Sequence, residues 1–346
     1  MTTTSWTAQS LYESLKDVTL GGSICLYTKE ICEKLVPKIN EINKLKKEQN
    51  AVILAHSYVV PEITRCVADF SGDSYELSKR AKQSNCDTII FSAVKFMAET
   101  AKLLNPNKRV IIPTDFNGCS LADSISANDI KKLKETYPKH TFVCYINTTA
   151  EVKAECHTCV TSSNVYDIIA EIEGPVYFLP DKLMAKNVIN ELRKRKIEKE
   201  VLFWEGSCYV HEEYDPEMID YIKLKHPNVH ILAHPECNDS IVEKSDFVGS
   251  TSQMMTQVNS TNYPSYFMLT ECGLTSRMQS ENSQKTFVGS CTMCKYMKAN
   301  TLDSILTALK NPKEENIISI NQTTRKKALQ CVEEMFNYTN KIYSKT

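Results

Sequence analysis

Three stretches of this 346-residue chain repeat one pattern, and the repeat limits the possible folds more than any other feature of the sequence. Each stretch opens with a short apolar run that ends at His56, Asn147 or His234, spaced by 91 and 87 residues. A hydroxyl-containing motif follows, at 72–74, 161–163 and 249–251, and then a second apolar run, at 88–91, 176–179 and 266–269. Each stretch closes on a glycine and a cysteine, at 118–120, 206–208 and 289–294.

The apolar runs alternate with helical patterns such as 75–83 and 164–173, which is typical of parallel strands joined by crossover helices. We therefore expect an α/β fold of three pseudo-threefold-related units, with parallel sheets around a central active site. The predicted divisions are an N-terminal helical lead-in at 1–50, α/β repeats at 51–135, 136–222 and 223–300, and C-terminal helices at 301–346.

Composition excludes several classes of protein. The formal net charge is -1, which argues against a nucleic-acid or membrane-surface partner. No apolar run approaches a membrane helix, and the polar start lacks a signal-peptide core, so we expect a cytoplasmic protein. The chain has only 9 glycines, with neither the Gly-x-Gly spacing of a dinucleotide loop nor a Gly-Lys-Ser/Thr phosphate loop. Nicotinamide-dependent dehydrogenases and P-loop nucleotidases are therefore disfavoured.

The repeated polar positions predict an anion site. Ligands of α/β units bind beyond the carboxyl ends of the strands, where His56, Asn147 and His234 fall. The hydroxyl motifs precede helical patterns, so we expect helix N-caps at Ser74, at Ser162 or Ser163, and at Ser250 or Thr251. Three helix N-termini that meet at one axis would favour a carboxylate or phosphate, hence a small anionic substrate.

Three of the 14 cysteines share the period of the chain, because Cys119, Cys208 and Cys294 are spaced by 89 and 86 residues. A lone cysteine is usually a small buried packing residue. Three thiols carried to one axis could instead bind a metal centre with one position open. Zinc is possible, although catalytic zinc more often has histidine and carboxylate ligands beside its thiolates. An iron–sulfur cluster suits three thiolates, and its free iron would act as a Lewis acid, as in a dehydratase.

Two Cys-x-x-Cys pairs compete with this scheme. The pairs Cys156/Cys159 and Cys291/Cys294 could together form a four-thiolate structural zinc site. The remaining cysteines carry no ligand spacing and are expected to be packing residues: Cys25, Cys32, Cys66, Cys86, Cys144, Cys237, Cys272 and Cys331. His56, His211 and His234 lie beside repeat landmarks, with Glu236 two residues after His234, and suit proton transfer. The role of His157 stays open.

A series of motifs between about Asn50 and Leu302 resembles the quinolinate synthase family. The motifs stand in order along the chain, which makes the series specific although no single member is. They are Ala55-His56-Ser57-Tyr58, Gly72-Asp73-Ser74, Phe96-Met97-Ala98-Glu99-Thr100-Ala101-Lys102, Gly118-Cys119-Ser120-Leu121, Tyr145-Ile146-Asn147-Thr148, Val160-Thr161-Ser162-Ser163-Asn164, Pro180-Asp181-Lys182, Gly206-Ser207-Cys208-Tyr209-Val210-His211-Glu212, Ala233-His234-Pro235-Glu236 and Gly249-Ser250-Thr251-Ser252.

The resemblance implies a 4Fe-4S cluster at the centre of a three-unit α/β fold. It also implies condensation of iminoaspartate with dihydroxyacetone phosphate to quinolinate, phosphate and two waters, in de novo NAD synthesis. The cluster ligands it implies are Cys119, Cys208 and Cys294. Cys294 is preferred to Cys291 because the family's last ligand precedes a pattern like Tyr296-Met297-Lys298, and because a spacing of 86 fits the repeat better than 83. An iminoaspartate-producing enzyme would be a functional partner.

The resemblance also implies site residues. Tyr58, His211, His234 and Glu236 are expected to move protons. The positions that would line the substrate site are His56, Tyr58, Ser74, Tyr145, Asn147, Ser162, His211, His234, Glu236, Ser250 and Thr251. The chain departs from the commonest family pattern at Ser57 and Val59, which could alter substrate fit near Tyr58.

Two alternatives remain beside this reading. One is a zinc-stabilised protein that binds a small dicarboxylate without turnover. Another is an iron–sulfur dehydratase or lyase that acts on a different substrate. A further hypothesis, compatible with either enzyme, is a disulfide between Cys291 and Cys294 under oxidising conditions.

Overall fold

Three four-stranded parallel sheets form the frame of the molecule, and all three have the same strand order, 2-1-3-4 along the chain. The structure is a computed structural model that describes residues 5–20, 24–289 and 292–344. The first sheet contains β3 (Ala51–His56), β4 (Phe70–Gly72), β5 (Thr88–Ser92) and β6 (Arg109–Ile111). The second contains β7 (Thr141–Tyr145), β8 (Thr158–Val160), β9 (Val176–Leu179) and β10 (Val201–Phe203). The third contains β11 (Val229–Ala233), β12 (Phe247–Val248), β13 (Ser265–Leu269) and β14 (Thr286–Val288).

The central strands are mainly apolar because helices cover both faces of each sheet. Every residue of β3, β9, β11 and β13 is buried, which is the pattern of a parallel strand rather than of a half-exposed one. The predicted second apolar runs correspond to β5, β9 and β13. The predicted three-unit α/β fold is therefore confirmed, while the exact domain boundaries stay a prediction.

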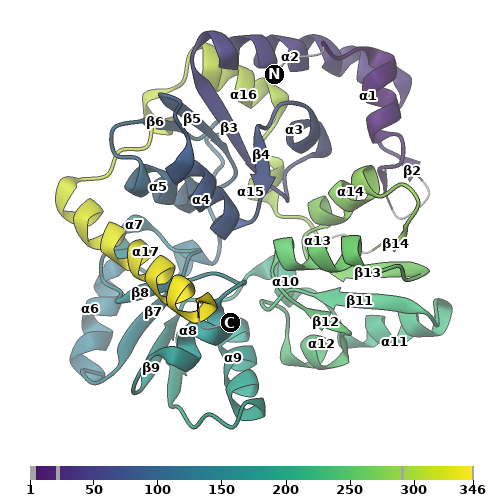
Figure 1. The fold of residues 1–346 in the computed structure, drawn as a ribbon. Helices are drawn as coiled ribbons and strands as arrows, with labels where there is room; N and C mark the ends of the chain where they lie inside the picture. Colours follow the sequence, from purple (N-terminus) through teal and green to yellow (C-terminus); the bar gives the residue numbers. More distant parts are fainter. Residues whose placement is uncertain (1–4, 21–23, 290–291, 345–346) are drawn as a thin grey trace.

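Helices pack around each sheet as crossover connections (Figure 1). Those of the first unit are α3 (Pro61–Cys66), α4 (Ser74–Gln83) and α5 (Lys95–Leu104). The second unit has α6 (Ala127–Thr136), α7 (Ala150–Lys153), α8 (Val165–Glu171) and α9 (Lys182–Lys194). The third has α11 (Pro216–Lys225), α12 (Asp239–Lys244), α13 (Thr251–Ser260) and α14 (Cys272–Glu281). The 3-10 turn η1 (Ala122–Ser124) follows β6, and the short helices α10 (Tyr209–Glu212) and α15 (Lys295–Lys298) lie near the centre (Figure 1).

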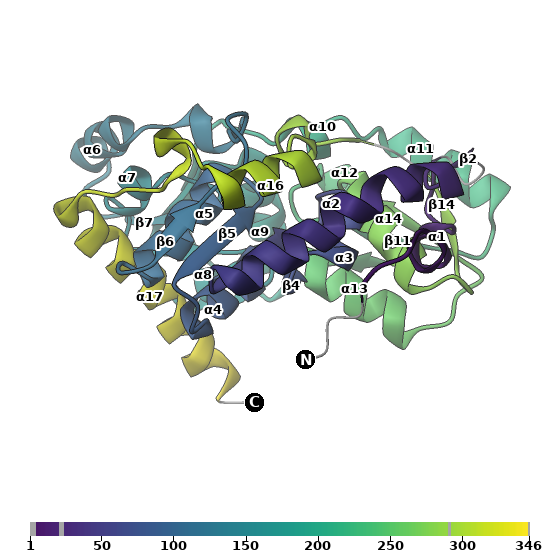
Figure 2. The ribbon, with the colours of Figure 1, turned by 90° about the horizontal axis from the view of Figure 1, so that it is seen from above.

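The chain ends are helical and pack back onto earlier units. The lead-in contains α1 (Ala8–Leu15), the hairpin β1 (Thr19–Leu20) and β2 (Ile24–Cys25), and α2 (Lys29–Glu48). After the third sheet, α16 (Leu302–Lys310) contacts α2 and β5 of the first unit, and Figure 2 shows α2 and α16 side by side. After η2 (Glu314–Asn316), α17 (Gln322–Tyr343) crosses the second unit, against β8, α7 and α8. Among the described residues, no helix combines the length and apolar character needed to cross a lipid bilayer.

Two of the three predicted helix caps are wrong. The N-cap of α4 is Asp73, whose carboxylate accepts from the backbone N–H of Glu76, so Ser74 is the first helical residue. Helix α8 begins after Asn164, and neither Ser162 nor Ser163 caps it. Ser250 does cap α13, in a capping box with Gln253. Aspartate and asparagine are caps at least as good as serine, so a motif that offers both does not decide between them.

Candidate active site

The three period-matched cysteines occupy one equivalent position of the repeat. In each unit, the backbone N–H of the first residue of one helix (α5, α9 or α14) donates to the carbonyl of the residue two positions before the cysteine. These bonds run from Lys95 to Asn117 (2.8 Å), from Lys182 to Gly206 (2.8 Å) and from Cys272 to Thr292 (3.0 Å). The equivalent of Cys119 and Cys208 is therefore Cys294, not Cys291, which lies outside the described residues.

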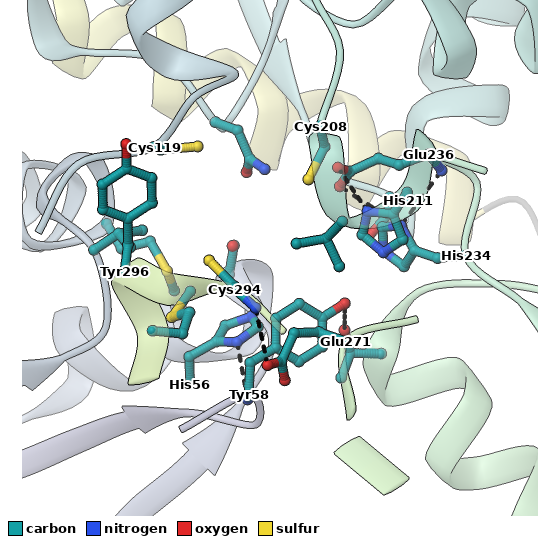
Figure 3. Close-up of a pocket in the computed structure, with 18 of the residues that line it drawn as sticks. His56, Tyr58, Cys119, Cys208, His211, His234, Glu236, Glu271, Cys294 and Tyr296 are labelled. Atoms are coloured by element: carbon teal, nitrogen blue, oxygen red, sulfur yellow. Dashed lines mark hydrogen bonds and ion pairs between the residues drawn. The ribbon is translucent and has the colours of Figure 1, made fainter. Parts of the chain in front are cut away.

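The three sulfur atoms point into one central cavity (Figure 3). Cys119, Cys208 and Cys294 all line this cavity, whose volume is about 720 Å³ including solvent at its mouth. Burial raises the pKa of the Cys119 thiol to about 12, and burial also raises the pKa values of Cys208 and Cys294. The thiols are close enough for each to disfavour ionisation of another. Such a set is costly as bare thiolates and suits a cationic centre that binds all three.

Short helical turns orient the cysteines. Cys208 and Cys294 are the N-caps of α10 and α15, and η1 follows Cys119 after a short turn. Backbone N–H groups of these turns face the thiols of Cys119 and Cys294 and lower their pKa values against the larger effect of burial. A helix N-terminus favours a thiolate, so the turns prepare these side chains to act as anionic ligands.

A buried network of carboxylate, imidazole and phenol groups lies beside Cys208. Glu236 follows β11 and its Oε1 accepts from the Tyr145 hydroxyl at 2.6 Å. His211 Nδ1 lies 3.2 Å from Glu236 Oε2, and His234 Nδ1 lies 3.5 Å from Oε1. Neither His211 Nδ1 nor Glu236 Oε2 has an aligned hydrogen-bond partner among the described residues, so their contact is electrostatic. The rings of His211 and His234 stack with centroids 4.7 Å apart.

The network combines an ionised acid with a neutral imidazole, that of His234, and a neutral phenol, that of Tyr145. Burial would raise the pKa of Glu236, but His211 and His234 and the Tyr145 hydroxyl outweigh it and lower this pKa to about 2. Burial lowers the pKa of His234 to about 3, against the opposing effect of Glu236. Burial raises the pKa of Tyr145 well above its ordinary value, with a further contribution from Glu236. The cavity thus holds groups able to accept and donate protons at neutral pH.

Tyr58 enters the cavity from the first unit and is held by the third. Its hydroxyl lies 2.7 Å from Thr270 Oγ1 and accepts from Thr251 Oγ1 at 3.4 Å. His211 Nε2 lies 3.3 Å from the same Thr270 Oγ1, so this hydroxyl links Tyr58 to the Glu236 network. His56, the last residue of β3, accepts from the backbone N–H of Tyr58 through Nδ1 at 3.2 Å.

All but one of the predicted substrate-site residues line the cavity. The residues that do so are His56, Tyr58, Ser74, Tyr145, Asn147, Ser162, His211, His234, Glu236 and Thr251. Ser250 is the predicted residue that is not among the described residues lining the cavity. It is fully buried, and its hydroxyl donates to Asp73 Oδ2 at 3.2 Å. That bond joins the first turns of α4 and α13 and therefore links the first unit to the third.

Sequence reasoning missed Glu271, a fully buried residue of the cavity wall. Its Oε1 accepts from the backbone N–H of Cys294 at 3.2 Å and contacts Lys298 Nζ at 2.9 Å. Lys298 also donates to the Tyr58 carbonyl at 2.6 Å, so one ion pair fixes the Cys294 turn to the Tyr58 loop. The sequence did carry one signal for it, which is its position in the repeat. Asp181 and Glu271 each lie two residues after the end of a strand, β9 or β13, and each forms a parallel β-bridge, Asp181 with Gly206 and Glu271 with Thr292.

A second metal position competes within the same cavity. Ligand atoms of Cys208, His211 and Glu236 all lie within 4.8 Å of one another, the only such group of His, Cys, Asp or Glu among the described residues. A thiolate, an imidazole and a carboxylate suit a single zinc ion with an open position. This arrangement and the three-thiol arrangement share Cys208.

The predicted pairing of the two Cys-x-x-Cys motifs is not formed by the described residues. Cys294 lines the cavity, whereas neither Cys156 nor Cys159 does. These two instead lie near Cys144 and Cys331. Two cysteines predicted to be isolated packing residues therefore belong to a thiol group of their own.

Comparison with known proteins identifies the family. The family model described as "Quinolinate synthetase A protein" matches residues 40–337. The chain belongs to the quinolinate synthase family. A quinolinate synthase of Sinorhizobium fredii is 40% identical over 328 residues, which cover 94% of this chain and 87% of that protein. Quinolinate synthase 2 of Mesorhizobium japonicum is 42% identical over 298 residues (86% and 90%), and the Alkaliphilus metalliredigens quinolinate synthase is 39% identical over 300 residues (86% and 97%). The sequence-based assignment to this enzyme family is confirmed.

Proposed function

We propose that the chain condenses iminoaspartate with dihydroxyacetone phosphate and releases quinolinate, phosphate and two waters. The observation that carries the proposal is the convergence of Cys119, Cys208 and Cys294, from three equivalent turns, on a cavity that also holds Tyr58 and Glu236. Family membership and the printed names of the relatives support the same activity.

The all-thiolate donor set fits a 4Fe-4S cluster with three protein ligands. Of the described cysteines, only Cys119, Cys208 and Cys294 line the cavity, which leaves the fourth iron without a cysteine. When bound, the cluster supplies a Lewis acid for a substrate oxygen at that iron. The protein's own part is to hold the three thiolates at helical turns and to keep water from the buried cavity.

Proton transfers fall to the buried network. Imine formation, isomerisation and aromatisation each move protons, and Tyr58, His234, His211 and Glu236 are the titratable groups that face the cavity. Glu236 is ionised and accepts from Tyr145, so its charge can stabilise a proton on a neighbouring imidazole. His234 is neutral because burial lowers its pKa to about 3, and the nearby charge of Glu236 favours its protonated form, so a proton that it takes from substrate is held only transiently.

The substrates bring two carboxylates and a phosphoryl group, and the cavity offers mainly neutral donors to them. Ser74, Ser162 and Thr251 supply hydroxyls, and Asn147 supplies an amide. Hydrogen-bond donors in a dry site bind anions firmly because no water competes with them. We include in the proposal a cytoplasmic location and an iminoaspartate-producing enzyme as functional partner, without a nucleic-acid or membrane partner.

Anaerobic iron and sulfide analysis of the purified protein tests the cofactor, and product analysis tests the reaction. We expect about four irons and four sulfides per chain with absorbance near about 400 nm. Oxaloacetate with ammonia, together with dihydroxyacetone phosphate, should give quinolinate. Iron-free, colourless protein that makes no quinolinate after anaerobic reconstitution would refute the proposal. A coloured protein without quinolinate would favour a dehydratase or lyase with another substrate.

A zinc-stabilised dicarboxylate-binding protein is the second candidate, and one observation favours it. The Cys208, His211 and Glu236 ligand atoms already lie within 4.8 Å of one another. Under this alternative the protein would hold zinc at that position and bind dicarboxylates without turnover. The two candidates separate on one variant, because Cys119→Ala should remove iron from the first but leave zinc in the second.

A further inference from the structure

Four cysteines lie together in the second unit, away from the central cavity. Cys144 is on β7, Cys159 on β8, Cys156 in the segment before β8, and Cys331 on α17. Cys144 and Cys159 are paired across the parallel strands, so both side chains leave the same face of the sheet, the face that α17 covers. Two neighbouring segments of the second unit and the distant C-terminal helix α17 thus bring four thiols to one place.

The sulfur atoms form a ring of neighbours. Cys144 Sγ lies 3.9 Å from Cys331 Sγ. The Cys144 and Cys156 thiols are also close enough to influence each other's ionisation, as are the Cys331 and Cys159 thiols, and Cys159 Sγ lies 3.8 Å from Met335 Sδ. Cys156 and Cys159, in turn, are close enough to influence each other's ionisation. A tetrahedral site with metal–sulfur bonds of about 2.3 Å has sulfur–sulfur edges of about 3.8 Å, close to the one sulfur separation known here.

The surrounding charges favour anionic sulfur. Lys153 is fully buried and makes no ion pair with a described residue; its ammonium donates only to oxygens of Ile146 and Thr148. Lys153 acts electrostatically on the buried carboxylate of Glu99 and on the Cys144 thiol, and in both cases it favours the anionic form. Lys134 acts in the same sense on Cys156. Both lysines already face carboxylates, Lys153 that of Glu99 and Lys134 that of Glu155 at 3.3 Å, so they offset the double negative charge of a divalent ion with four thiolates only in part.

The site has a route from solvent. Cys156 is partly exposed and lines a surface pocket with Lys134, Tyr137 and Glu155, whereas Cys144, Cys159 and Cys331 are buried. No three of these sulfurs yet lie within 4.8 Å of one another in the described structure. Binding would therefore contract the ring, and Cys156 is the ligand with room to move.

We infer that Cys144, Cys156, Cys159 and Cys331 form a second, structural metal site for a thiophilic divalent cation of the zinc class. Thiolates select such ions over magnesium or calcium, and Cys-x-x-Cys supplies two ligands with the spacing of structural zinc sites. The site would stabilise the end of β7, because Cys144 directly precedes Tyr145. Lys153 supports the following residues, since it donates to the Ile146 and Thr148 carbonyls on either side of Asn147. The inference does not depend on the proposed reaction.

The test is zinc analysis of the holoenzyme, purified anaerobically from cells grown with added zinc. We expect about one zinc per chain, with X-ray absorption at the zinc edge showing four sulfur ligands at about 2.3 Å. The zinc edge is separate from that of iron, so a cluster does not interfere. Zinc far below one per chain, nitrogen or oxygen ligands, or a disulfide among these cysteines would overturn the inference.

Variants locate the ion. Cys331→Ser should lower the zinc content at least about tenfold, because a ligand is lost. Cys32→Ser, which changes an equally buried cysteine elsewhere, should leave it unchanged. Cys208→Ala should also keep this zinc, whereas zinc that leaves with Cys208 and stays in Cys331→Ser belongs to the central cavity and refutes the site. If Cys331→Ser fails to fold, the ligand set of the unaltered protein still decides.

Discussion

At the scale of single residues, burial in the cavity affects the charge of histidine and of glutamate differently. His56 and His234 stay unprotonated at neutral pH, because burial lowers their pKa values to about 3. Glu236 keeps its charge, with a pKa of about 2, because imidazoles and the Tyr145 hydroxyl surround it. One carboxylate therefore organises the proton-carrying groups around it.

Glu236→Gln tests that role. The amide keeps an acceptor for the Tyr145 hydroxyl but removes the charge that His211 and His234 face. Quinolinate formation should fall about 10²- to 10⁴-fold while iron content and absorbance persist. Glu243→Gln, an exposed change on α12, serves as the control and should leave turnover unchanged. Full activity in Glu236→Gln would contradict the assignment.

A second prediction distinguishes the two neighbouring cysteines. Cys294→Ala should abolish both cluster absorbance and turnover, because Cys294 holds the position equivalent to Cys119 and Cys208 in the repeat. Cys291→Ala should retain the cluster. Iron and sulfide per chain, measured anaerobically for both variants, check this. Loss of iron from Cys291→Ala alone would reverse the choice of ligand.

At the scale of elements, the site depends on contacts between units rather than within them. Helix α14 of the third unit approaches the Tyr58 loop of the first at Gly273. A Cβ there would lie 2.3 Å from the Tyr58 carbonyl oxygen and 2.7 Å from both Glu271 Oε2 and Lys298 Nζ. No side chain fits without moving the backbone of one unit against the other.

Gly273→Ala should therefore destabilise the protein, by about 1–3 kcal/mol from overpacking, although the same change stabilises an exposed helix. We also expect less iron per chain, because Glu271 holds the Cys294 turn. Urea unfolding and iron analysis measure the two effects. Gly174→Ala is the matched control, because Gly174 has a left-handed backbone conformation and open space around the position of a Cβ. It should lower the free energy of unfolding by about 1–2 kcal/mol through backbone strain alone and leave the iron content unchanged.

At the scale of the whole molecule, buried neutral histidines make stability depend on pH. His56 and His234 have pKa values of about 3 when folded and 6.5 as the ordinary value. Below about pH 6.5 the unfolded chain binds protons that the folded chain does not, so stability is complete above that pH and is lost progressively down to about pH 3. Each histidine contributes up to about 1.4 kcal/mol per pH unit in that window.

The pH dependence is measurable by urea unfolding of the metal-free chain between about pH 5 and about pH 7, above the range where Glu236 titrates. The contribution of the two histidines to the free energy of unfolding should fall as pH falls, whereas Asp181 and Glu271, whose pKa values burial raises, act in the opposite sense. His56→Gln removes one of the two groups, so its slope should be shallower by up to about 1.4 kcal/mol per pH unit. An unchanged slope in this variant would show that His56 is not buried in neutral form.

How much the sequence determined differs between strands and site. The apolar runs that became β5, β9 and β13 were readable because a buried parallel strand needs apolar side chains on both faces. The period also marked Cys119, Cys208 and Cys294, because equivalent turns recur at equal spacing. Helix starts were read less well, since Asp73 and Asn164 compete with neighbouring serines for the cap.

Tertiary structure alone decided which distant side chains meet. Glu271 joins Cys294 and Lys298 to Tyr58 across two units, and Cys331 on the last helix reaches Cys144 on β7. The repeat marks the position of Glu271 but not its partners in the first unit, and it does not mark Cys331, because these contacts depend on how the units and the returning C-terminal helix pack. Local pattern fixes the strands and the repeat, whereas the meeting of charges and thiols follows from the packing of whole units.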